Sequence, residues 1–562
     1  MNTDTVDTVD TTAGAGADNS LLLEMRGLCI EGFSDEEWHQ IVKDVDITLH
    51  RGRMLGLIGE SGAGKSTIGI AAMGYAKPGC RINGGRIVFD GVDLTAASEE
   101  EKRRLRGAKI AYVAQSAAAA FNPAHKLIDQ FAEAVTEHGI GSRDDAYADA
   151  RDLYARIKMP DPDSIGFRYP HQVSGGQLQR AMTAMALSCR PDLLIFDEPT
   201  TALDVTTQIE VLVTMRDIVE QFNCAAIYIT HDLAVVAQMA DNIMVLRHGE
   251  TVEEAETRRM LSAPQADYTK SLWAVRSFRK QHPAPPPEDT PLIKVDNVTA
   301  AYGPVTVLHE VDFAIHRGHT VAVVGESGSG KSTAARVITG LLPPQTGAIY
   351  YDGAKYPGNY RKRSKEQLRH VQMIYQMADT AVNPRQKIRD IVGRPLSFYL
   401  GMDGDEKERR LRELMDMIEL DPNKFLDRLP AELSGGQKQR ICIARALAAE
   451  PAFIICDEVT SALDQLVAEG ILKLLDRLQR ELNLAYMFIT HDLATVNAIA
   501  DEVIVMLQGR IVEQGAKHEI FSPPHHQYTE LLLSSVPEMD PDWMDNVLAQ
   551  RRAKGGMAAA GN

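Results

Sequence analysis

Short apolar runs that end in turn-forming or acidic residues recur along the chain. Met54–Ile58, Leu193–Phe196 and Ala225–Thr230 have the length and composition of buried parallel strands. Stretches with a more helical pattern lie between such runs, chiefly Leu127–Met159 in the first half and Lys387–Ile418 in the second. This alternation predicts an α/β core that carries an all-helical insertion.

The first apolar run leads directly into a glycine-rich loop, and the same happens again after Thr320–Val324. The two loops, GESGAGKS and GESGSGKS, both fit the pattern G-x4-G-K-[ST] between a strand and a helix. Their backbone amides would form an anion site, the lysine would reach the β- and γ-phosphates, and the serine hydroxyl would ligate Mg²⁺. A glycine-rich turn that binds nothing is the alternative, and the second copy argues against it. The predicted ATP-binding residues here are Gly59, Glu60, Ser61, Gly62, Ala63, Gly64, Lys65, Ser66 and Thr67, and Gly325, Glu326, Ser327, Gly328, Ser329, Gly330, Lys331, Ser332 and Thr333.

The two halves of the chain repeat one another. The two loop lysines are 266 positions apart, whereas three later pairs of motifs are each 260 positions apart. A duplicated domain that lost six residues after the second loop explains this register. The three pairs are SGGQ at Ser174 and Ser434, Asp-Glu at Asp197 and Asp457, and Thr-His-Asp around His231 and His491.

The boundaries of the two domains follow from composition. We expect the first domain over 21–275 and the second over 292–540, joined by a proline-rich linker over 276–291 that contains QHPAPPPEDTP. Residues 1–20 have neither the basic nor the apolar region of a signal peptide, and they predict a disordered tail. A C-terminal tail is expected over 541–562, and its last part, Arg551–Asn562, is rich in glycine and alanine.

Each half contains an apolar strand that ends in two acids, LLIFDEPT and FIICDEVT. The first acid, Asp197 or Asp457, can hold Mg²⁺ through water. The second acid, Glu198 or Glu458, is placed to polarise an attacking water. An acidic strand end can also simply cap the next helix, but the phosphate loop upstream favours the catalytic interpretation.

The motifs QVSGGQLQR and ELSGGQKQR each place a serine and two glycines where a helix opens, predicted over Gln177–Leu187 and Gln437–Leu447. The hydroxyl, the amides and the helix dipole all favour an anion there. Two phosphate loops and two further anion sites in one chain suggest sites shared within a dimer of domains. The residues concerned are Ser174, Gly175, Gly176 and Gln177, and Ser434, Gly435, Gly436 and Gln437.

With these motifs in this order, the chain resembles a tandem ATP-binding-cassette ATPase over nearly its whole length. The resemblance implies that each cassette has a RecA-like core, a small antiparallel sheet and a helical subdomain. It also implies head-to-tail stacking, with each ATP between one phosphate loop and the opposite SGGQ signature. Lys65 would then share a nucleotide with Ser434–Gln437, and Lys331 with Ser174–Gln177.

The same resemblance assigns roles to residues outside these motifs. His231 and His491 match the histidine that senses the γ-phosphate, although a lone histidine there is more often a satisfied strand-end residue. Tyr302 matches the aromatic residue that stacks on adenine. Phe33 is its counterpart in the first half, and a three-residue insertion before Ile41 leaves Trp38 as an alternative. The Mg²⁺-contacting glutamines would be Gln115 and Gln376, and the aspartates of the loops that cross the dimer seam would be Asp204 and Asp464.

Two departures from the family pattern concern single apolar residues. Val173 stands where leucine is usual, and Val459 stands where the first half has Pro199. Neither change removes a ligand, and both catalytic glutamates and both histidines are present. We therefore expect two competent hydrolytic sites.

Composition narrows the class of cassette protein. The 562 residues carry a formal net charge of −17, which disfavours a nucleic-acid binder because phosphate neutralisation needs a basic surface. No apolar run reaches the roughly 18 residues that a membrane span needs. The cysteines include no C-x-x-C pair, so we expect a reducing compartment and neither an iron–sulfur cluster nor a zinc site. They are Cys29, Cys80, Cys189, Cys224, Cys442 and Cys456.

The C-terminal segment of each cassette indicates which class of ABC protein the chain resembles. FSPPHHQYTELLLSSVP over Phe521–Pro537 resembles the peptide/nickel branch of importer ATPases, and Leu261–Val275 is a weaker echo of it. This resemblance implies two separate permease subunits, an extracytoplasmic solute-binding protein and a position on the cytoplasmic face of the plasma membrane. The alternatives are a tandem cassette ATPase that acts on ribosomes, or the same importer with nickel, an opine or another small solute as cargo.

Overall fold

The computed structural model describes residues 20–34, 36–200, 203–274, 280, 290–461 and 463–550. Most of both predicted tails and most of the proline-rich linker lie outside these residues. The described chain divides into two compact units. The first contains the residues up to Pro199 with Leu212–Thr230 and Met239–Met260, and the second contains the remainder.

The first cassette is built on a six-stranded sheet of order β10-β9-β3-β8-β7-β6. All neighbours in it are parallel except β9 and β10. Every residue of β3, β7 and β8 is buried, as expected for central strands covered on both faces. The strands are β3 (Met54–Gly59), β6 (Ile110–Val113), β7 (Leu193–Asp197), β8 (Ala225–Ile229), β9 (Asn242–Arg247) and β10 (Glu250–Glu256).

A separate antiparallel sheet of order β2-β1-β4-β5 completes the β-structure of this cassette. Apolar residues of its long strands pack with the phosphate-loop helix α1 in one hydrophobic core. The elements are β1 (Leu21–Ser34), β2 (Glu37–His50), α1 (Lys65–Ala71), β4 (Cys80–Phe89), β5 (Val92–Asp93) and α2 (Glu99–Leu105).

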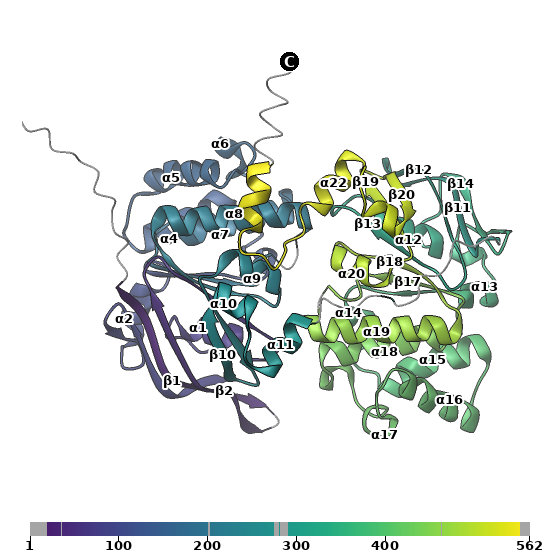
Figure 1. Ribbon diagram of the computed structural model, residues 1–562, viewed down its shortest axis with the longest axis horizontal. Coiled ribbons are helices and arrows are strands. Elements are labelled where there is room, and N and C mark those ends of the chain that lie inside the picture. Colours follow the sequence, from purple (N-terminus) through teal and green to yellow (C-terminus); the bar gives the residue numbers. More distant parts are fainter. Residues whose placement is uncertain are drawn as a thin grey trace, which may run out of the picture. The chain divides into compact units, whose positions relative to one another are not determined.

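The predicted helical stretch Leu127–Met159 forms two helices, α4 (Leu127–Glu137) and α5 (Arg143–Arg156). They are separate because Gly139 takes a left-handed φ of 65° and Ser142 opens α5 as its N-cap. In Figure 1 these helices gather with α6 and α7 at the end of the cassette away from β1 and β2. The further elements are α3 (Ala117–Ala120), α6 (Pro162–Ile165), α7 (Gly175–Leu187), α8 (Val205–Phe222), α9 (Leu233–Met239), α10 (Thr257–Ser262) and α11 (Asp267–Ala274).

The second cassette repeats the design, with sheets of order β16-β17-β18-β13-β19-β20 and β12-β11-β14-β15. Its strands are β11 (Ile293–Tyr302), β12 (Val305–Ile315), β13 (Thr320–Val324), β14 (Thr346–Tyr351), β15 (Ala354–Tyr356), β16 (Val371–Ile374), β17 (Phe453–Asp457), β18 (Ala485–Ile489), β19 (Glu502–Leu507) and β20 (Arg510–Ala516). Helices α15 to α17 lie at the opposite end of the cassette from β11, β12 and β14 (Figure 1). The helices are α12 (Lys331–Thr339), α13 (Lys365–His370), α14 (Ala378–Ala381), α15 (Ile388–Leu400), α16 (Gly404–Met417), α17 (Pro422–Phe425), α18 (Gly435–Leu447), α19 (Gln465–Leu482), α20 (Leu493–Ile499), α21 (Lys517–Ile520) and α22 (Gln527–Leu533). Among the residues that the structure describes, no helix combines the length and the apolar composition of a membrane span.

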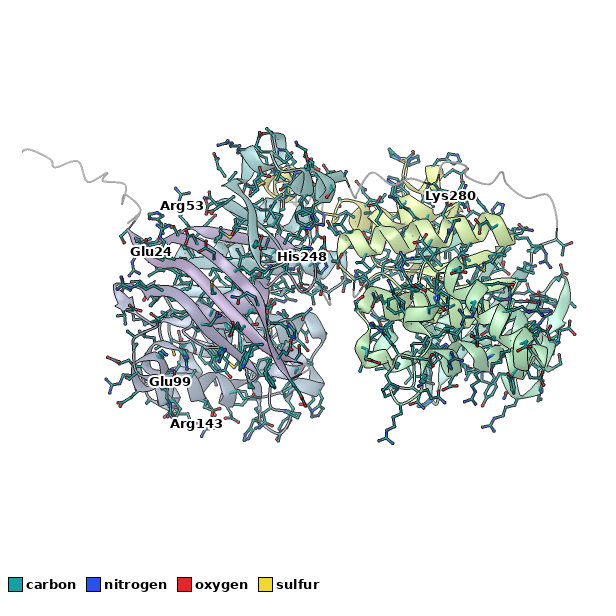
Figure 2. The ribbon with its side chains drawn as sticks, turned by 90° about the horizontal axis from the view of Figure 1, so that it is seen from below. Glu24, Arg53, Glu99, Arg143, His248 and Lys280 are labelled. Carbon is teal, nitrogen blue, oxygen red and sulfur yellow. The ribbon has the colours of Figure 1, made fainter. Side chains whose placement is uncertain are left out.

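One residue of the predicted linker region, Lys280, is buried against the second cassette (Figure 2). Its Nζ lies 2.6 Å from Oδ2 of Asp501 and 2.8 Å from Oε1 of Gln479, and its amide donates to the carbonyl of Ala498. The side chains of Lys280 and Asp501 are only 5% and 3% exposed, so this ion pair is desolvated.

The first cassette pairs the corresponding aspartate differently. Asp241 accepts hydrogen bonds from the Arg53 guanidinium (2.9 Å) and from the amide of Met54. Arg53 immediately precedes β3 and is 58% exposed. The residue that precedes β13 in the second cassette is His319, so Lys280 supplies the cation that a local arginine supplies in the first.

Candidate active site

In each phosphate loop, the lysine ammonium donates hydrogen bonds to two backbone carbonyls of the same loop. Nζ of Lys65 donates to the carbonyls of Gly59 (2.7 Å) and Glu60 (2.9 Å). Lys331 makes the same bonds to Gly325 (2.8 Å) and Glu326 (2.7 Å). Both lysines open a helix, α1 and α12, and both are buried. Burial lowers the pKa of Lys331, although nearby carboxylates oppose the shift.

Glycine is required at the first position of each loop. Gly59 and Gly325 have φ of 149° and 145°. A Cβ on them would lie 2.1 Å from the carbonyl oxygen of Leu246 and 2.2 Å from that of Met506, respectively. The start of the loop therefore lies so close to the backbone of the neighbouring strand, β9 or β19, that only glycine fits.

The loop serine and the first acid of the strand-end pair meet in both cassettes. Oγ of Ser66 donates to Oδ1 of Asp197 at 2.8 Å, and Oγ of Ser332 donates to Oδ1 of Asp457 at 3.1 Å. The pair consists of a hydroxyl and a carboxylate beside a phosphate-binding loop, and both are hard oxygen ligands that suit Mg²⁺. Burial raises the pKa of Asp457, and the adjacent Glu458 adds to this shift.

The second acid of each pair accepts a hydrogen bond from the predicted glutamine. Nε2 of Gln115 donates to Oε2 of Glu198 at 2.9 Å, and Nε2 of Gln376 donates to Oε2 of Glu458. In the second cassette the histidine joins this group, since Nδ1 of His491 lies 3.4 Å from Oε1 of Glu458.

The electrostatics of this group favour an ionised Glu458. Burial acts to raise its pKa, but the hydrogen bond with His491 and the Lys331 charge outweigh burial, so the pKa is lowered. For His491 burial acts to lower the pKa, and the Glu458 carboxylate outweighs it, so the pKa is raised. An ionised carboxylate with these partners can orient and polarise a water molecule.

Both glutamates predicted to be catalytic occupy left-handed backbone conformations. Glu198 has φ of 48° and Glu458 has φ of 50°. Their amides still extend the sheet by donating to the carbonyls of Ile229 and Ile489, each at 2.9 Å. Such a φ is uncommon outside glycine, asparagine and aspartate. This conformation turns the chain at the carboxyl end of the strand. The glutamate side chain there contacts the predicted glutamine, Gln115 or Gln376.

Sequence reasoning missed one residue of the first site. The hydroxyl of Tyr112, on β6, donates to Oδ2 of Asp197, the oxygen that Ser66 does not use. Burial, reinforced by this bond, raises the pKa of Tyr112, so its hydroxyl stays a donor. Met373 occupies this position on β16 in the second cassette. The motif YVAQ contains the tyrosine, but its role depends on the pairing of β6 with β7, which sequence does not give.

The two signatures open helices α7 and α18, two residues earlier than expected. Oγ of Ser174 accepts from the amide of Gln177 at 3.3 Å, and Ser434 does the same for Gln437. The serine amides in turn donate to Oε1 of Gln177 and Gln437, which completes a capping box at each helix. A Cβ at Gly436 would lie 2.4 Å from Cγ1 of Val467, so close packing also requires that glycine.

The predicted adenine-stacking residues lie at the ends of β-hairpins. Phe33 and Trp38 are cross-strand partners with ring centroids 5.3 Å apart, both exposed, and the guanidinium of Arg81 lies over Trp38 at 4.0 Å. Tyr302 is exposed and accepts a hydrogen bond from Arg336 at 2.9 Å. The choice between Phe33 and Trp38 stays a prediction.

The remaining predicted residues cap helices. Oδ1 of Asp464 accepts from the amide of Val467 at the start of α19, and Oδ1 of Asp204 accepts from the amide of Thr207 at the start of α8. His231 lies between β8 and α9, as His491 lies between β18 and α20. The roles assigned to these residues stay predictions. The described part of the chain holds no cluster of three or more His, Cys, Asp or Glu residues placed to bind a metal.

Comparison with known families finds the same match in both halves of the chain. The ABC transporter family matches residues 42–201 and again 308–461. These two matches cover more than half of the chain. The chain belongs to the ABC transporter ATPases.

Relatives and a further match refine this assignment. The glutathione import ATP-binding protein GsiA of Escherichia coli O157:H7 is 36% identical over 92% of this chain and 90% of its own length. The protein of the same name in Salmonella typhimurium is 35% identical over 93% and 91%. Residues 512–558 match the oligopeptide/dipeptide transporter C-terminal region. Among solved structures, CbiO1 of Clostridium perfringens, part of an ABC transporter complex, is 28% identical with a TM-score of 0.38 over 42% of this chain and 91% of that one.

Several expectations from sequence are thereby confirmed. The chain is an α/β protein with two ABC ATPase cassettes, it is an ATPase, and it ends in a segment of the peptide-transporter type. The ABC family fold also confirms ATP as the nucleotide.

Proposed function

We propose that this ABC ATPase energises the import of peptides or peptide-like solutes. It would dock on two transmembrane permease subunits at the cytoplasmic face of the plasma membrane, and an extracytoplasmic binding protein would deliver the cargo. One observation carries this proposal. Two complete sets of phosphate loop, acid pair and glutamine stand in one chain that ends in a peptide-transporter C-terminal region.

Two hydroxyl–carboxylate pairs fit the Mg²⁺ that accompanies ATP. Ser66 with Asp197, and Ser332 with Asp457, would hold the ion beside the phosphates. When bound, the ion would neutralise charge on the β- and γ-phosphates. Gln115 and Gln376, which donate to Glu198 and Glu458, would contact the same ion, as the resemblance to the family implies.

Different side chains would bind the phosphates, orient the attacking water and contact the γ-phosphate. Lys65 and Lys331, each held by two loop carbonyls, would donate the remaining N–H of the ammonium to the phosphates, while the loop amides bind the remaining oxygens. Glu198 and Glu458 would orient the attacking water for in-line displacement. His231 and His491 would contact the γ-phosphate, and the raised pKa of His491 favours the charged form that binds an anion.

ATP would act by favouring a closed arrangement of the two cassettes. We propose that Ser434–Gln437 completes the nucleotide site of Lys65, and that Ser174–Gln177 completes the site of Lys331. A ligand shifts an equilibrium only through its differential affinity for two states, and a site completed only on closure supplies that difference. Closure would then move the permease helices, and hydrolysis would reset the pair.

The class of cargo is proposed from relatives. The similar proteins of Escherichia coli and Salmonella are named for glutathione import, and glutathione is a small peptide. Nickel, opines and other small solutes stay the alternatives within the importer class, and action on ribosomes is the alternative outside it. The 36% identity over 92% of the chain favours the importer.

Affinity purification of the tagged, full-length protein from gently solubilised membranes would test this proposal, with mass spectrometry of the proteins retained. Two polytopic permeases are the expected partners, and an extracytoplasmic binding protein should follow when the complex is kept intact. A Lys65→Ala/Lys331→Ala variant, purified in parallel, would separate docking from nucleotide binding. Recovery of ribosomal proteins in place of permeases would contradict the importer and leave the ATPase assignment standing.

A further inference from the structure

The C-terminal region of the second cassette contacts the nucleotide loop directly. The backbone amide of Glu326, the second residue of the loop, donates a hydrogen bond of 2.9 Å to the hydroxyl oxygen of Tyr528. Tyr528 lies on α22, 202 positions further along the chain. The match to the oligopeptide/dipeptide transporter C-terminal region includes this tyrosine.

This hydrogen bond acts on the peptide unit that also holds the loop lysine. The amide of Glu326 and the carbonyl of Gly325 belong to one planar peptide. That carbonyl accepts from Nζ of Lys331 at 2.8 Å. Tyr528 and Lys331 therefore hold opposite edges of the same peptide. Hydrogen bonds in series through a peptide polarise one another, so each bond strengthens the other.

Tyr528 is itself held firmly in place. The residue is only 7% exposed, and its side chain packs in a core cluster with Val324, the last residue of β13 before the loop. Its amide donates to Nδ1 of His526, which caps α22. Burial raises the pKa of Tyr528 to about 12, so the hydroxyl is neutral at physiological pH.

We propose that Tyr528 is a positioning residue for ATP binding at the second cassette. Its hydroxyl fixes the Gly325–Glu326 peptide, and that peptide in turn places the Lys331 ammonium for the β- and γ-phosphates. The region downstream of the cassette is thus part of the support of its nucleotide site. The residue acts through the loop and does not touch the reacting atoms.

The test is nucleotide binding to Tyr528→Phe, which keeps the ring and its packing but lacks the hydroxyl. The full-length chain would carry Lys65→Ala and Glu458→Gln in all samples, so that binding reports the second loop without turnover. The probe is a fluorescent ATP analogue titrated in the presence of Mg²⁺. We expect Kd to rise about three- to tenfold, the range for loss of one neutral hydrogen bond.

Tyr486→Phe is the matched control in the same cassette. The hydroxyl of Tyr486 is buried and donates to the carbonyl of Leu475 at 3.2 Å, away from the loop. Its loss should lower the melting temperature and leave Kd unchanged. Tyr528→Met, which keeps an apolar side chain, serves as a second variant and should raise Kd as Tyr528→Phe does. An unchanged Kd in folded Tyr528→Phe, or an equal rise in Tyr486→Phe, would overturn the proposal.

Discussion

Nδ1 of His491 lies 3.4 Å from Oε1 of Glu458, at the carboxyl ends of two adjacent parallel strands. The carboxylate raises the pKa of the imidazole despite burial, and the imidazole helps to lower the pKa of the carboxylate. The two groups therefore favour one another in their charged forms. The contact therefore favours the ionised form of the Glu458 carboxylate.

This pair gives the second cassette a pH-dependent contribution to stability. A raised histidine pKa contributes stability that is complete below the unfolded value near 6.5 and is lost as pH rises through the folded value. His491→Gln should remove about 1 kcal/mol at pH 6 and much less at pH 9. Thermal melting of the nucleotide-free protein across this range would measure the difference. A destabilisation that is constant from pH 6 to pH 9 would contradict it.

Replacing Glu198 and Glu458 one at a time tests whether both sites hydrolyse ATP. Glu198→Gln and Glu458→Gln keep the shape of the side chain and remove the charge that polarises water. We expect each variant alone to lose roughly half of the steady-state turnover, since a positioned general base contributes about 10²- to 10⁴-fold at its own site and the other site is left intact. Steady-state phosphate release is the measurement, with nucleotide binding as the control for folding. Full activity in either variant would show that the cassettes are not equivalent.

Tyr112 should tune Mg²⁺ use in the first cassette only. Tyr112→Phe removes the hydroxyl that donates to Oδ2 of Asp197, the oxygen that Ser66 does not contact. Loss of a hydrogen bond to a ligand of a metal commonly costs about 10- to 100-fold in metal affinity. We expect a higher Mg²⁺ requirement for ATPase activity in a Glu458→Gln background, where the first site alone turns over. Met373→Leu, the matched change in the second cassette, examined in the Glu198→Gln background, should leave the Mg²⁺ requirement unchanged.

Breaking the Lys280–Asp501 pair should destabilise the second cassette strongly. Lys280→Met leaves a buried carboxylate without its cation, a loss of about 3–5 kcal/mol. His319→Arg restores a local cation at the position that Arg53 holds in the first cassette, so the double variant should recover part of this loss. Denaturant unfolding measures each free energy of unfolding. Arg53→Met is the control and should cost about 1 kcal/mol or less because Arg53 is exposed.

Sequence patterns predicted what is local, and they missed what depends on distant pairing. The loops, the acid pairs and the helical insertion follow from short motifs, and the structure forms Ser66–Asp197 and Gln115–Glu198 contacts from them. Tyr112 and Tyr528 lie within quoted motifs, but neither motif predicts the contact that its tyrosine makes. Each acts across 85 or 202 positions through the packing of one strand or helix on another. A single sequence contains no signal for such contacts.

The helix starts show the same limit on a smaller scale. The signature helices begin at Gly175 and Gly435, not at Gln177 and Gln437. Glycine has poor intrinsic helix propensity, so the pattern alone places the start later. The serine–glutamine capping box outweighs that preference.

The burial of Lys280 changes where the second cassette begins as a folding unit. Sequence composition places its start at Leu292, after the prolines. A fragment cut there would lack the ammonium that pairs with the buried carboxylate of Asp501. The self-sufficient second cassette therefore starts before Lys280, so the segment that joins the two halves belongs in part to the fold of the second.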